Sequence, residues 1–382
     1  MKLALVRQKY NPYGGAERFV ERALAALGAQ GIAATLITRE WQGPPGQAVR
    51  ICNPFHLGRL WRDRGFARGV QAIIARGEFD LVQSHERIPG CDIYRAGDGV
   101  HATWLELRDR TRSAAARAAT RFNPWHRYTL AAEAALFRHP RLQAVICNSR
   151  MVRDDIARRF GVDDAHLHVI GNGIDLAQFH PGLRQAHRAR LRAELGLAAA
   201  APVVLFVGSG FERKGVPALL QALARLQHRD AQLLVVGSDR RAAALRALAG
   251  RLGVEGRVRF VGGQADVRPF YGAADVFCLP TLYDPMPNAA LEALACGLPV
   301  VTSSDCGAAE LIEAGRNGFV CGARDVAALA GHLDALCAPG AAAGLAAAAR
   351  ASVAGLDLES MARRLAALYG ALAPRPPAPP PL

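Results

Sequence analysis

Short runs of apolar, often β-branched residues alternate along this chain with longer helical stretches, and this alternation constrains the fold more than any other feature. In the first half we expect strands over residues 2–6, 32–38, 80–83 and 143–147. The pattern starts again in the second half, where we expect strands over residues 202–207, 232–236, 257–261, 276–279 and 299–302. Alternating strands and helices are typical of parallel sheets with crossover helices. The sequence therefore predicts an α/β protein.

The chain divides into two halves. Its 382 residues exceed one ordinary core and favour two domains of about 180 residues each. Turn and breaker residues follow one another from Asn172 to Gly182, where we place the boundary. We expect an N-terminal domain over 1–180, a C-terminal domain over 181–355, a terminal helix over 356–373 and a proline-rich tail over 374–382. Two Rossmann-like, doubly wound sheets facing one another would bind a ligand in the cleft beyond the carboxyl ends of their strands.

Composition limits the class of protein and of partner. A hydrophobic content of 51% with 21% charged residues indicates a globular protein, and the net charge of +14 favours nucleic acid, an anionic membrane or a phosphorylated substrate. The eight cysteines form no C-x-x-C pair, which favours reduced core thiols over a zinc site or disulfides. The first apolar run is broken at Arg7, and no stretch approaches the ~18 apolar residues of a membrane span. We expect a soluble or peripheral cytoplasmic protein.

The segment from Tyr283 to Pro299, YDPMPNAALEALACGLP, carries two carboxylates with seven residues between them. Asn288 lies between the two and is placed to cap a helix, whose free N–H groups and dipole would attract phosphate. Glu292 falls one turn inside this helix, where it would reach the hydroxyls of a sugar attached to that phosphate. Asp284 would contact the other end of the ligand from the loop. This combination suits a nucleotide sugar.

A glycine-containing loop follows the first strand of each predicted domain. Gly14 and Gly15 allow a backbone to approach a phosphate or sugar closely, although a plain tight turn explains them equally well. The second loop, GSGFERKG, places Arg213 and Lys214 beside a helix start, where cations oppose the helix dipole and so need another reason to be there. Diphosphate binding is that reason, and a solvated helix terminus is the alternative. Neither loop matches a P-loop or G-x-G-x-x-G.

Several segments in order, VIGNGIDLAQFHP, VGSGFERKG, VRFVGG and AADVFCLPTLYDPMPNAALEALACGLPVVTS among them, resemble the retaining glycosyltransferases of the GT-B fold that use an E-x7-E motif. The likeness spans roughly residues 1–325. NPYGGAERFVERAL and GCDIYRAGDGVHATWLE resemble the bacterial enzymes that add glucose to heptose of the lipopolysaccharide inner core. The resemblance implies a nucleotide-sugar donor, most simply UDP-glucose, an anionic glycolipid acceptor, and no cofactor or divalent metal. It also implies that the terminal helix crosses back to the first domain.

The resemblance assigns roles to matching positions. Lys214, with Arg213, would neutralise the diphosphate leaving group, Glu292 would hold the ribose, and Asp284 the donor sugar. The family usually has Glu at the position of Asp284, so the carboxylate here is one methylene shorter. Asp98 matches the acid on the acceptor side of the closer relatives and would orient the acceptor hydroxyl, unless it only stabilises its glycine turn. His85 and His101 are further candidates for that task.

The segment from Trp104 to Tyr128 interleaves aromatic residues with six arginines, and Pro124 within it is placed to begin a new helix. Basic elements with Trp and Tyr lie in membrane interfaces, which predicts peripheral contact with the anionic inner face of the cytoplasmic membrane. The alternative is a solvated arginine face whose aromatics belong to the core.

Three other functions are compatible with parts of this pattern. A glycosyltransferase of the same fold with another donor or acceptor, such as a mannosyltransferase, would share the donor motifs. A sugar-nucleotide epimerase would share the diphosphate grip without an acceptor site. A nucleic-acid-binding protein would explain the charge, but paired carboxylates in the second half would repel a phosphate backbone, so we expect no nucleic acid as a partner.

Overall fold

The computed structural model describes residues 1–8, 32–41, 46, 48–110 and 112–372. They form two compact units: unit 1 is Met1–Gly171 together with the segment that starts at Leu358, and unit 2 is Asn172–Asp357. The change from one unit to the other comes after Gly171, earlier than the boundary that we placed at 180. The reason is that the turn-rich segment after Gly171 packs on unit 2, where Ile174 and Phe179 are buried in the core.

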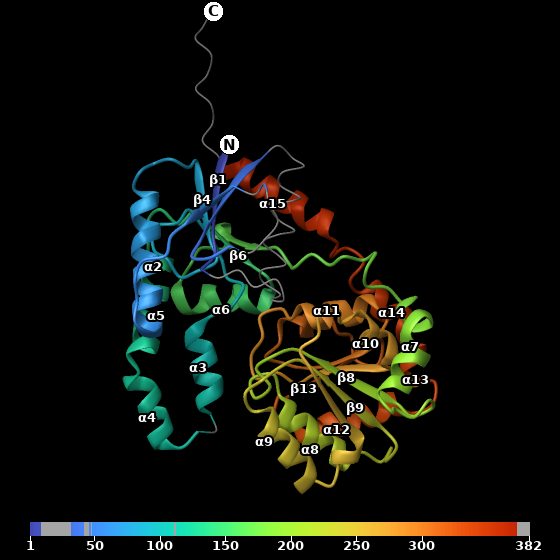
Figure 1. Ribbon diagram of the computed structural model, residues 1–382. Helices are drawn as coiled ribbons and strands as arrows, with labels where there is room; N and C mark the ends of the chain where they lie inside the picture. Colours follow the sequence, from blue (N-terminus) through green and yellow to red (C-terminus); the bar gives the residue numbers. More distant parts are fainter. Residues whose placement is uncertain (9–31, 42–45, 47, 111, 373–382) are drawn as a thin grey trace, which may run out of the picture. The chain divides into compact units, whose positions relative to one another are not determined.

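Unit 1 contains a seven-stranded parallel sheet in the order β3-β2-β1-β4-β5-β6-β7 (Figure 1). Its strands are β1 Lys2–Val6, β2 Ala33–Thr38, β3 Val49–Ile51, β4 Leu81–Ser84, β5 Ile93–Arg95, β6 Ala144–Cys147 and β7 Leu167–Val169. The four strands that we predicted here are confirmed within a residue or so at each end. The three that we missed, β3, β5 and β7, are three residues long each, which is too short for an apolar run to stand out.

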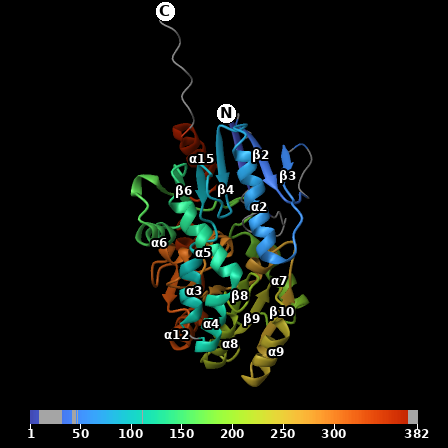
Figure 2. The ribbon, with the colours of Figure 1, turned by 90° about the vertical axis from the view of Figure 1, so that its left-hand side faces the viewer.

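Helices cover both faces of this sheet. They are α2 Gly58–Ile74, α3 His101–Asp109, α4 Ala114–Phe122, α5 Pro124–Phe137, α6 Arg150–Phe160 and α15 Leu358–Leu372, with a short 3₁₀ turn at Asp164–His166. Ala4 and Val6 face a core shared with α2, α5 and α6, while Leu3 and Leu5 face α15, because successive strand side chains point to opposite faces. Figure 2 shows α2 and α5 in front of the sheet, and Figure 1 shows α15 on its other side.

The terminal helix α15 belongs to unit 1, as the family resemblance implied. Met361, Leu365 and Leu368 are buried against β1 and its neighbours, as the apolar spacing of this helix requires. Tyr369 is fully buried, and its hydroxyl donates a hydrogen bond of 2.7 Å to the Gln83 side chain on β4. The last helix of the chain thus completes the core of the first unit.

Unit 2 contains a six-stranded parallel sheet in the order β10-β9-β8-β11-β12-β13. Its strands are β8 Val203–Val207, β9 Gln232–Val236, β10 Val258–Gly262, β11 Val276–Leu279, β12 Val300–Ser303 and β13 Gly318–Cys321. All five strands that we predicted in this half are present, and β13 was missed. Both sheets are parallel and doubly wound, which confirms the predicted α/β class.

The helices of unit 2 are α7 Leu183–Glu194, α8 Val216–Arg225, α9 Ala242–Arg251, α10 Arg268–Ala273, α11 Asn288–Ala295, α12 Val326–Cys337, α13 Ala341–Gly344 and α14 Ala346–Ala351, with 3₁₀ turns at Glu255–Arg257 and Gly307–Leu311. Helices α10 and α11 lie on one face of the sheet, and α8, α9 and α12 lie on the other (Figure 1). The sheet is therefore a buried layer between two helical layers, as its almost continuously apolar strands predict.

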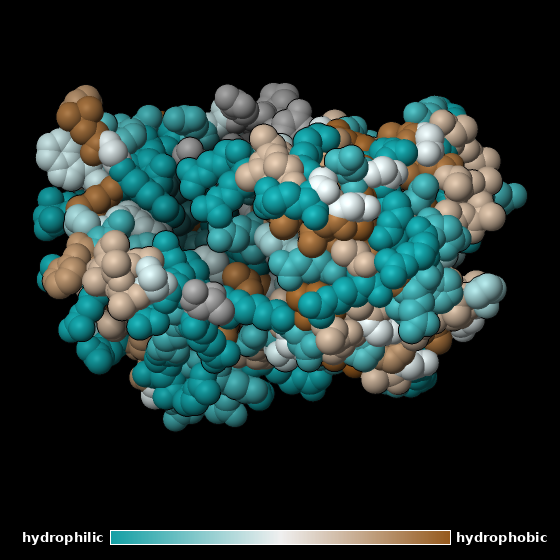
Figure 3. Space-filling view, turned by 90° about the horizontal axis from the view of Figure 1, so that it is seen from below, coloured by the Kyte–Doolittle hydropathy of each residue, from teal (hydrophilic) through white to brown (hydrophobic). Residues whose placement is uncertain are grey.

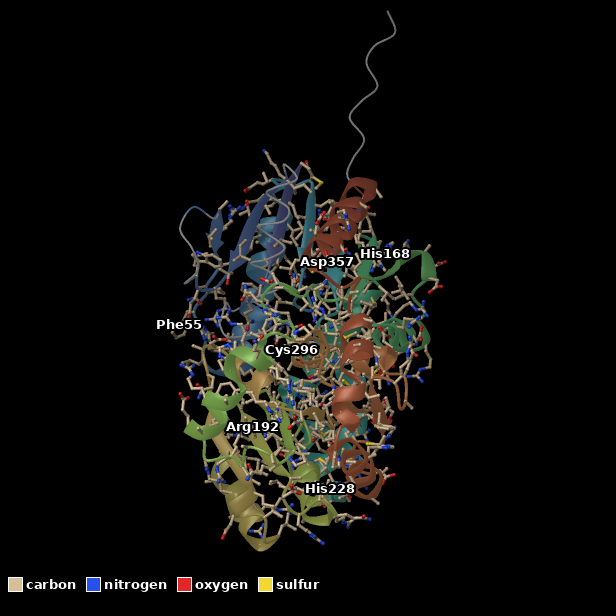
Figure 4. All side chains as sticks on the ribbon, turned by 90° about the vertical axis from the view of Figure 1, so that its right-hand side faces the viewer. Phe55, His168, Arg192, His228, Cys296 and Asp357 are labelled. Atoms are coloured by element: carbon tan, nitrogen blue, oxygen red, sulfur yellow. The ribbon has the colours of Figure 1, made fainter. Side chains whose placement is uncertain are left out.

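A buried arginine fixes the two central strands of this sheet at their amino ends. Arg192 on α7 (Figure 4) is 2% exposed and donates to a carboxylate oxygen of Asp275 over 2.6 Å. The same oxygen of Asp275, which directly precedes β11, accepts a bond of 2.9 Å from the N–H of Val203, where β8 begins. Burial would raise the pKa of Asp275, but Arg188, Val203 and Arg192 lower it. The ion pair thereby aligns β8 with β11.

The surface and the cysteines match the composition. Figure 3 shows a face on which hydrophilic residues predominate. Seven of the eight cysteines are buried, Cys52 is half-buried, and none forms a disulfide. Burial raises the pKa of Cys321 to about 11, so this thiol stays protonated. Among the residues that the structure describes, no helix is long and apolar enough to cross a bilayer.

Candidate active site

The topology of unit 2 marks one position for a ligand. After β8 the chain adds β9 and β10 on one side of it, and then returns to place β11 on the other side. The helices that follow β8 and β11, α8 and α11, therefore lie on opposite faces of the sheet. Open α/β sheets bind ligands at such a switch point, beyond the carboxyl ends of the strands. The two loops, 208–215 and 280–287, are those that the sequence singled out.

The two loops lie directly on one another, and a glycine makes this possible. Gly215 has φ +84°, and a Cβ added to it would lie 2.0 Å from the carbonyl oxygen of Pro280. The N–H of Leu282 donates a bond of 2.7 Å to the carbonyl oxygen of Arg213. No side chain larger than hydrogen fits at position 215 without moving the backbone of the β11 loop.

Two cations meet one carboxylate at this junction. The Lys214 ammonium lies 3.3 Å from a carboxylate oxygen of Asp284, and the Arg213 guanidinium lies 3.4 Å from the same oxygen. Arg213 also donates a bond of 2.7 Å to the carbonyl oxygen of Tyr283. The Lys214 side chain lies along Gly208, where an added Cβ would come within 2.9 Å of it. The junction is partly buried and has an excess of positive charge, which suits a polyanion such as a diphosphate.

The backbone of Asp284 is held from a third strand. Its N–H donates to the carbonyl oxygen of Asp305 over 3.2 Å, and its own carbonyl oxygen accepts from the N–H of Gly307 over 2.8 Å. Both partners follow β12, so the carboxylate rests on a loop fixed on two sides. Asp284 is 7% exposed and has little freedom to move.

Helix α11 corrects one sequence prediction. We expected Asn288 to cap this helix, but the helix begins at Asn288 itself and Pro287 occupies the capping position. The Asn288 side-chain oxygen instead accepts a bond of 2.6 Å from Asn172, which also donates to the Met286 carbonyl over 3.1 Å. This contact comes from far away in the chain, so local sequence could not reveal it.

Glu292 is 3% exposed and lies one turn inside α11, as predicted. The Tyr271 hydroxyl on α10 donates a hydrogen bond of 3.0 Å to it and also lies 3.2 Å from the Ala289 carbonyl oxygen. A buried carboxylate in a site of this kind needs such a donor to fix its orientation. Tyr271 was not singled out by the sequence, where it reads as one more core aromatic.

A second residue that the sequence analysis missed supports the β8 loop. Asp239, two positions beyond Gly237 after β9, accepts bonds from the N–H groups of Phe211 over 2.9 Å and Arg241 over 2.7 Å. Burial would raise the pKa of Asp239, but these backbone donors lower it below its ordinary value. A Cβ on Gly237 would lie 2.0 Å from the carbonyl oxygen of Gly208, so the β9 end packs tightly on the loop. Loop 208–215 is thus held by two neighbouring strands.

Unit 1 places Asp98 at the carboxyl edge of its own sheet. The residue lies in the loop between β5 and α3, its side chain is 56% exposed, and one of its oxygens lies 3.8 Å from the Arg7 guanidinium. Arg7 also lies 3.5 Å from Glu86, which follows β4. These side chains surround the switch point of the first sheet, between β1 and β4. Gly14 and Gly15, which we predicted nearby, lie outside the described residues.

A buried ion pair supports the loop that carries Asp98. Glu133 on α5 is 1% exposed, accepts a bond of 2.8 Å from Arg87, and accepts from the N–H groups of His101 over 2.9 Å and Ala102 over 3.4 Å. Helix α3 is therefore capped by a carboxylate from another helix, since Val100 offers no side-chain cap. Arg87 also donates to the Gly99 carbonyl over 2.8 Å. Burial would lower the pKa of Arg87, but Tyr94 and Glu133 raise it.

The two histidine candidates are buried and serve as neutral hydrogen-bonding groups. Burial, with Arg87 and His126, lowers the pKa of His101 to about 3, and its ring nitrogen lies 3.0 Å from that of His126. Burial and two arginines lower the pKa of His85 well below its ordinary value, and Gln83 lies 3.1 Å from its ring. Asp98 is therefore the more accessible of the three candidates.

Comparisons with known proteins agree with this geometry. The family model described as "Glycosyltransferase Family 4" matches residues 13–178, and that described as "Glycosyl transferases group 1" matches residues 201–338. The crystal structure of WaaG, a glycosyltransferase involved in lipopolysaccharide biosynthesis, superposes with a TM-score of 0.82 at 25% identity, covering 96% of this chain and 99% of that one. The chain is a group 1 glycosyltransferase of the GT-B fold.

Two relatives of this glycosyltransferase are named for lipopolysaccharide synthesis. The lipopolysaccharide glucosyltransferase WaaG of Escherichia coli K12 is 27% identical over 326 residues, which cover 84% of this chain and 85% of the relative. The lipopolysaccharide core biosynthesis glycosyltransferase LpsE of Rhizobium meliloti is 42% identical over 129 residues, which cover 34% of this chain and 37% of the relative. The chain is therefore related to enzymes of lipopolysaccharide core assembly.

Two loops and one helix of unit 2 contribute the charged side chains of the candidate site. Lys214 and Arg213 approach the junction from the β8 loop, and Asp284 and Glu292 come from the β11 loop and helix α11. Among the described residues, no three His, Cys, Asp or Glu side chains are arranged to hold a metal ion together.

Proposed function

We propose that the protein is a retaining glucosyltransferase that transfers glucose from UDP-glucose to a heptose of the lipopolysaccharide inner core. The observation that carries the proposal is the junction of Lys214, Arg213 and Asp284 at the switch point of unit 2. The relationship to WaaG and LpsE supports the acceptor class, and the name of WaaG supports glucose as the sugar.

The donor would lie with its diphosphate at Lys214 and Arg213. When a donor binds, the diphosphate competes with Asp284 for both cations, which then neutralise the charge that develops as the glycosidic bond breaks. Asp284 is thereby freed to accept a hydrogen bond from a hydroxyl of the glucose. Glu292, oriented by Tyr271, would accept hydrogen bonds from the ribose hydroxyls. The reaction needs no cofactor, and the two cations take the part that a divalent metal plays in other transferases.

The chemistry follows from the leaving group. The bond between the anomeric carbon and the diphosphate oxygen breaks, and the acceptor oxygen forms its bond to that carbon from the same face. The proton of the acceptor hydroxyl passes to the departing phosphate oxygen, so no side-chain nucleophile is required and the anomeric configuration is retained. Asp98 would orient the acceptor hydroxyl, since it is exposed at the carboxyl edge of the first sheet. Arg87 and Glu133 position the loop that carries it.

The shorter carboxylate at position 284 bears on the choice of donor. The family usually has Glu there, and Asp284 reaches one methylene less far. Its loop is fixed by Asp305 and Gly307, so the loop does not compensate by moving. We expect the contact with the sugar to include a bridging water, and Asp284→Glu to change the preference between UDP-glucose and its epimer UDP-galactose.

Contact with the anionic inner face of the cytoplasmic membrane completes the proposal. The segment from Trp104 to Tyr128 forms α3, α4 and the start of α5, and Pro124 begins α5 as predicted. Almost every residue of α4 is exposed, and Phe122 at its end is 73% exposed. An exposed basic helix that ends in an exposed aromatic residue fits a bilayer interface, where the glycolipid acceptor is held.

Thermal unfolding in the presence of nucleotides tests the proposal. We expect UDP and UDP-glucose, but not GDP or ADP, to raise the melting temperature, with or without EDTA, because ligands that bind only the native state stabilise it. Glu292→Ala should abolish the shift, whereas Glu313→Ala, an exposed carboxylate in the same unit, should keep it.

A transfer assay then separates the remaining functions. Labelled glucose should appear on a heptose-terminated lipopolysaccharide core, with the α configuration of the donor retained. Interconversion of UDP-sugars without any acceptor would identify an epimerase instead. A shift by a different nucleotide, or a shift that EDTA removes, would refute the proposed donor.

A further inference from the structure

The large apolar side chains that are exposed in the described residues all belong to unit 1. They are Met1, Ile51, Phe55, Leu57, Trp61 and Phe122. Three of them occur within seven residues: Phe55 is 83% exposed, Leu57 69% and Trp61 56%. Figure 4 shows Phe55 at the margin of the ribbon. Single exposed apolar residues are ordinary, but a local group of large ones marks an interaction site.

The first turns of α2 combine these side chains with positive charge. Trp61, Arg64 and Arg68 are exposed and recur at the spacing of one helix face, whereas Phe66 and Val70 on the opposite face are buried in the core. The exposed face thus carries an aromatic residue followed by two cations, and Phe55 and Leu57 directly precede the helix in the chain. We call Phe55, Leu57 and Trp61 the β3–α2 arm.

The arm adjoins the corner between α4 and α5. The Arg59 guanidinium lies over the Trp125 ring at 3.3 Å from its centroid, and the Trp125 ring N–H donates a bond of 2.7 Å to Asp63 on α2. Trp125 lies in the first turn of α5, directly after the α4 end that exposes Phe122. The start of α2 is therefore fixed to the element that we assign to the membrane, and both present exposed aromatics.

We propose that the β3–α2 arm is a second membrane anchor, which inserts into the interface of an anionic phospholipid leaflet while Arg64 and Arg68 contact the headgroups. The inference rests on the proposed membrane-bound acceptor. Charge complementarity identifies the occupant, because the exposed charged residues beside the arm, Arg59, Arg64 and Arg68, are all cations. Trp and Phe are the side chains that favour the bilayer interface. The arm and the α4–α5 corner together would attach unit 1 to the bilayer at two points. Two points of attachment restrict the orientation of unit 1 on the bilayer more than a single point does.

Vesicle binding of the full-length protein tests the arm. The wild type should sediment with vesicles of 70% phosphatidylcholine and 30% phosphatidylglycerol, and weakly with phosphatidylcholine alone. Phe55→Ser/Leu57→Ser/Trp61→Ser should weaken binding at least tenfold. Arg64→Gln/Arg68→Gln should weaken it about fivefold for each arginine. The matched control, Arg225→Gln/Arg251→Gln on exposed positions of unit 2, should bind as the wild type does.

Two readouts keep the outcomes distinct. Stabilisation by UDP should be unchanged in the arm variants, which shows that they fold and that the donor site is intact. Brominated lipid should quench the tryptophan fluorescence of the wild type more than that of Trp61→Phe. Wild-type binding by the triple variant, or a triple variant that is monomeric where the wild type is dimeric, would overturn the proposal. Failure of the wild type to bind any vesicle would overturn the membrane contact as well, while UDP stabilisation would still support the donor site.

Discussion

Replacing Glu133 by glutamine tests the claim that a buried carboxylate holds the loop that carries Asp98 in unit 1. The side chain is 1% exposed and is shared by the Arg87 guanidinium and two N–H groups at the start of α3. Glutamine keeps the shape and one acceptor oxygen but removes the charge. The guanidinium of Arg87, whose side chain is 17% exposed, then loses its carboxylate partner.

The expected cost follows from these contacts. Breaking a buried ion pair by removing one partner costs roughly 3–5 kcal/mol. The amide oxygen of glutamine still accepts a hydrogen bond, so we expect the lower end, about 3 kcal/mol. Replacing both partners, as in Arg87→Met/Glu133→Leu, removes the unpaired charge and should cost clearly less than the sum of the two single changes, with a coupling of about 2 kcal/mol.

Urea unfolding followed by circular dichroism measures this difference. With a typical m of about 2 kcal/mol/M, Glu133→Gln should lower the midpoint of the unit 1 transition by about 1.5 M. Glu78→Gln serves as the control, because Glu78 pairs with Arg50 at the surface, where an ion pair contributes roughly 0–1 kcal/mol. A midpoint shift for Glu133→Gln no larger than that of Glu78→Gln, with additive effects in the double variant, would refute the reasoning.

Four further results are expected. Lys214→Ala should lower the transfer rate by about 10²–10³, the loss typical of one charge-stabilising donor, whereas Lys214→Arg should retain part of it, as an assay with UDP-glucose would show. Tyr271→Phe should raise the KM for UDP-glucose with a smaller effect on kcat, because it leaves Glu292 without its orienting hydroxyl. The pKa of His101 is about 3 in the folded protein and near 6.5 in the unfolded chain. The contribution of the neutral imidazole to the free energy of unfolding is therefore complete above pH 6.5 and is lost as the pH falls toward 3. His101→Gln should accordingly flatten the fall in unfolding free energy below pH 6.5 by at most about 1.4 kcal/mol per pH unit in urea titrations. Truncation before Leu358 should impair activity and stability far more than removal of residues 374–382, and equal tolerance of both cuts in a transfer assay would contradict the role given to the terminal helix.

The sequence was sufficient to predict the strands of four or more residues, apart from β13, and insufficient to predict the strands of three residues. Lys2–Val6, Gln232–Val236 and Val276–Leu279 agree with their predicted limits, because each contains an apolar run of four residues bounded by polar or breaker residues. β5, Ile93–Arg95, ends in a buried arginine and is three residues long, so it does not read as a strand. Its place in the sheet depends on pairing with β4 and β6, which local patterns do not encode.

The candidate site divides in the same way. Lys214, Asp284 and Glu292 were predicted because their chemistry is unusual for their positions, and the structure brings the first two together although 70 residues separate them. Their roles remain predictions. Asp239, Tyr271 and Glu133 act through contacts between elements far apart in the chain, and no local signal reveals such contacts. The capping role given to Asn288 was wrong for that reason, since Asn172 engages its side chain.

The return of α15 to unit 1 bears on how the chain folds during synthesis. Domains generally fold in the order in which they leave the ribosome, the N-terminal one first. Here Leu3 and Leu5 on β1 face Leu365 and Tyr369, which are made only after the whole of unit 2. Unit 2 is continuous in sequence and has all its parts once Asp357 has emerged. One face of the first sheet therefore stays uncovered until the last helix has been translated. In that interval the nascent unit 1 depends on chaperones or on its own solubility.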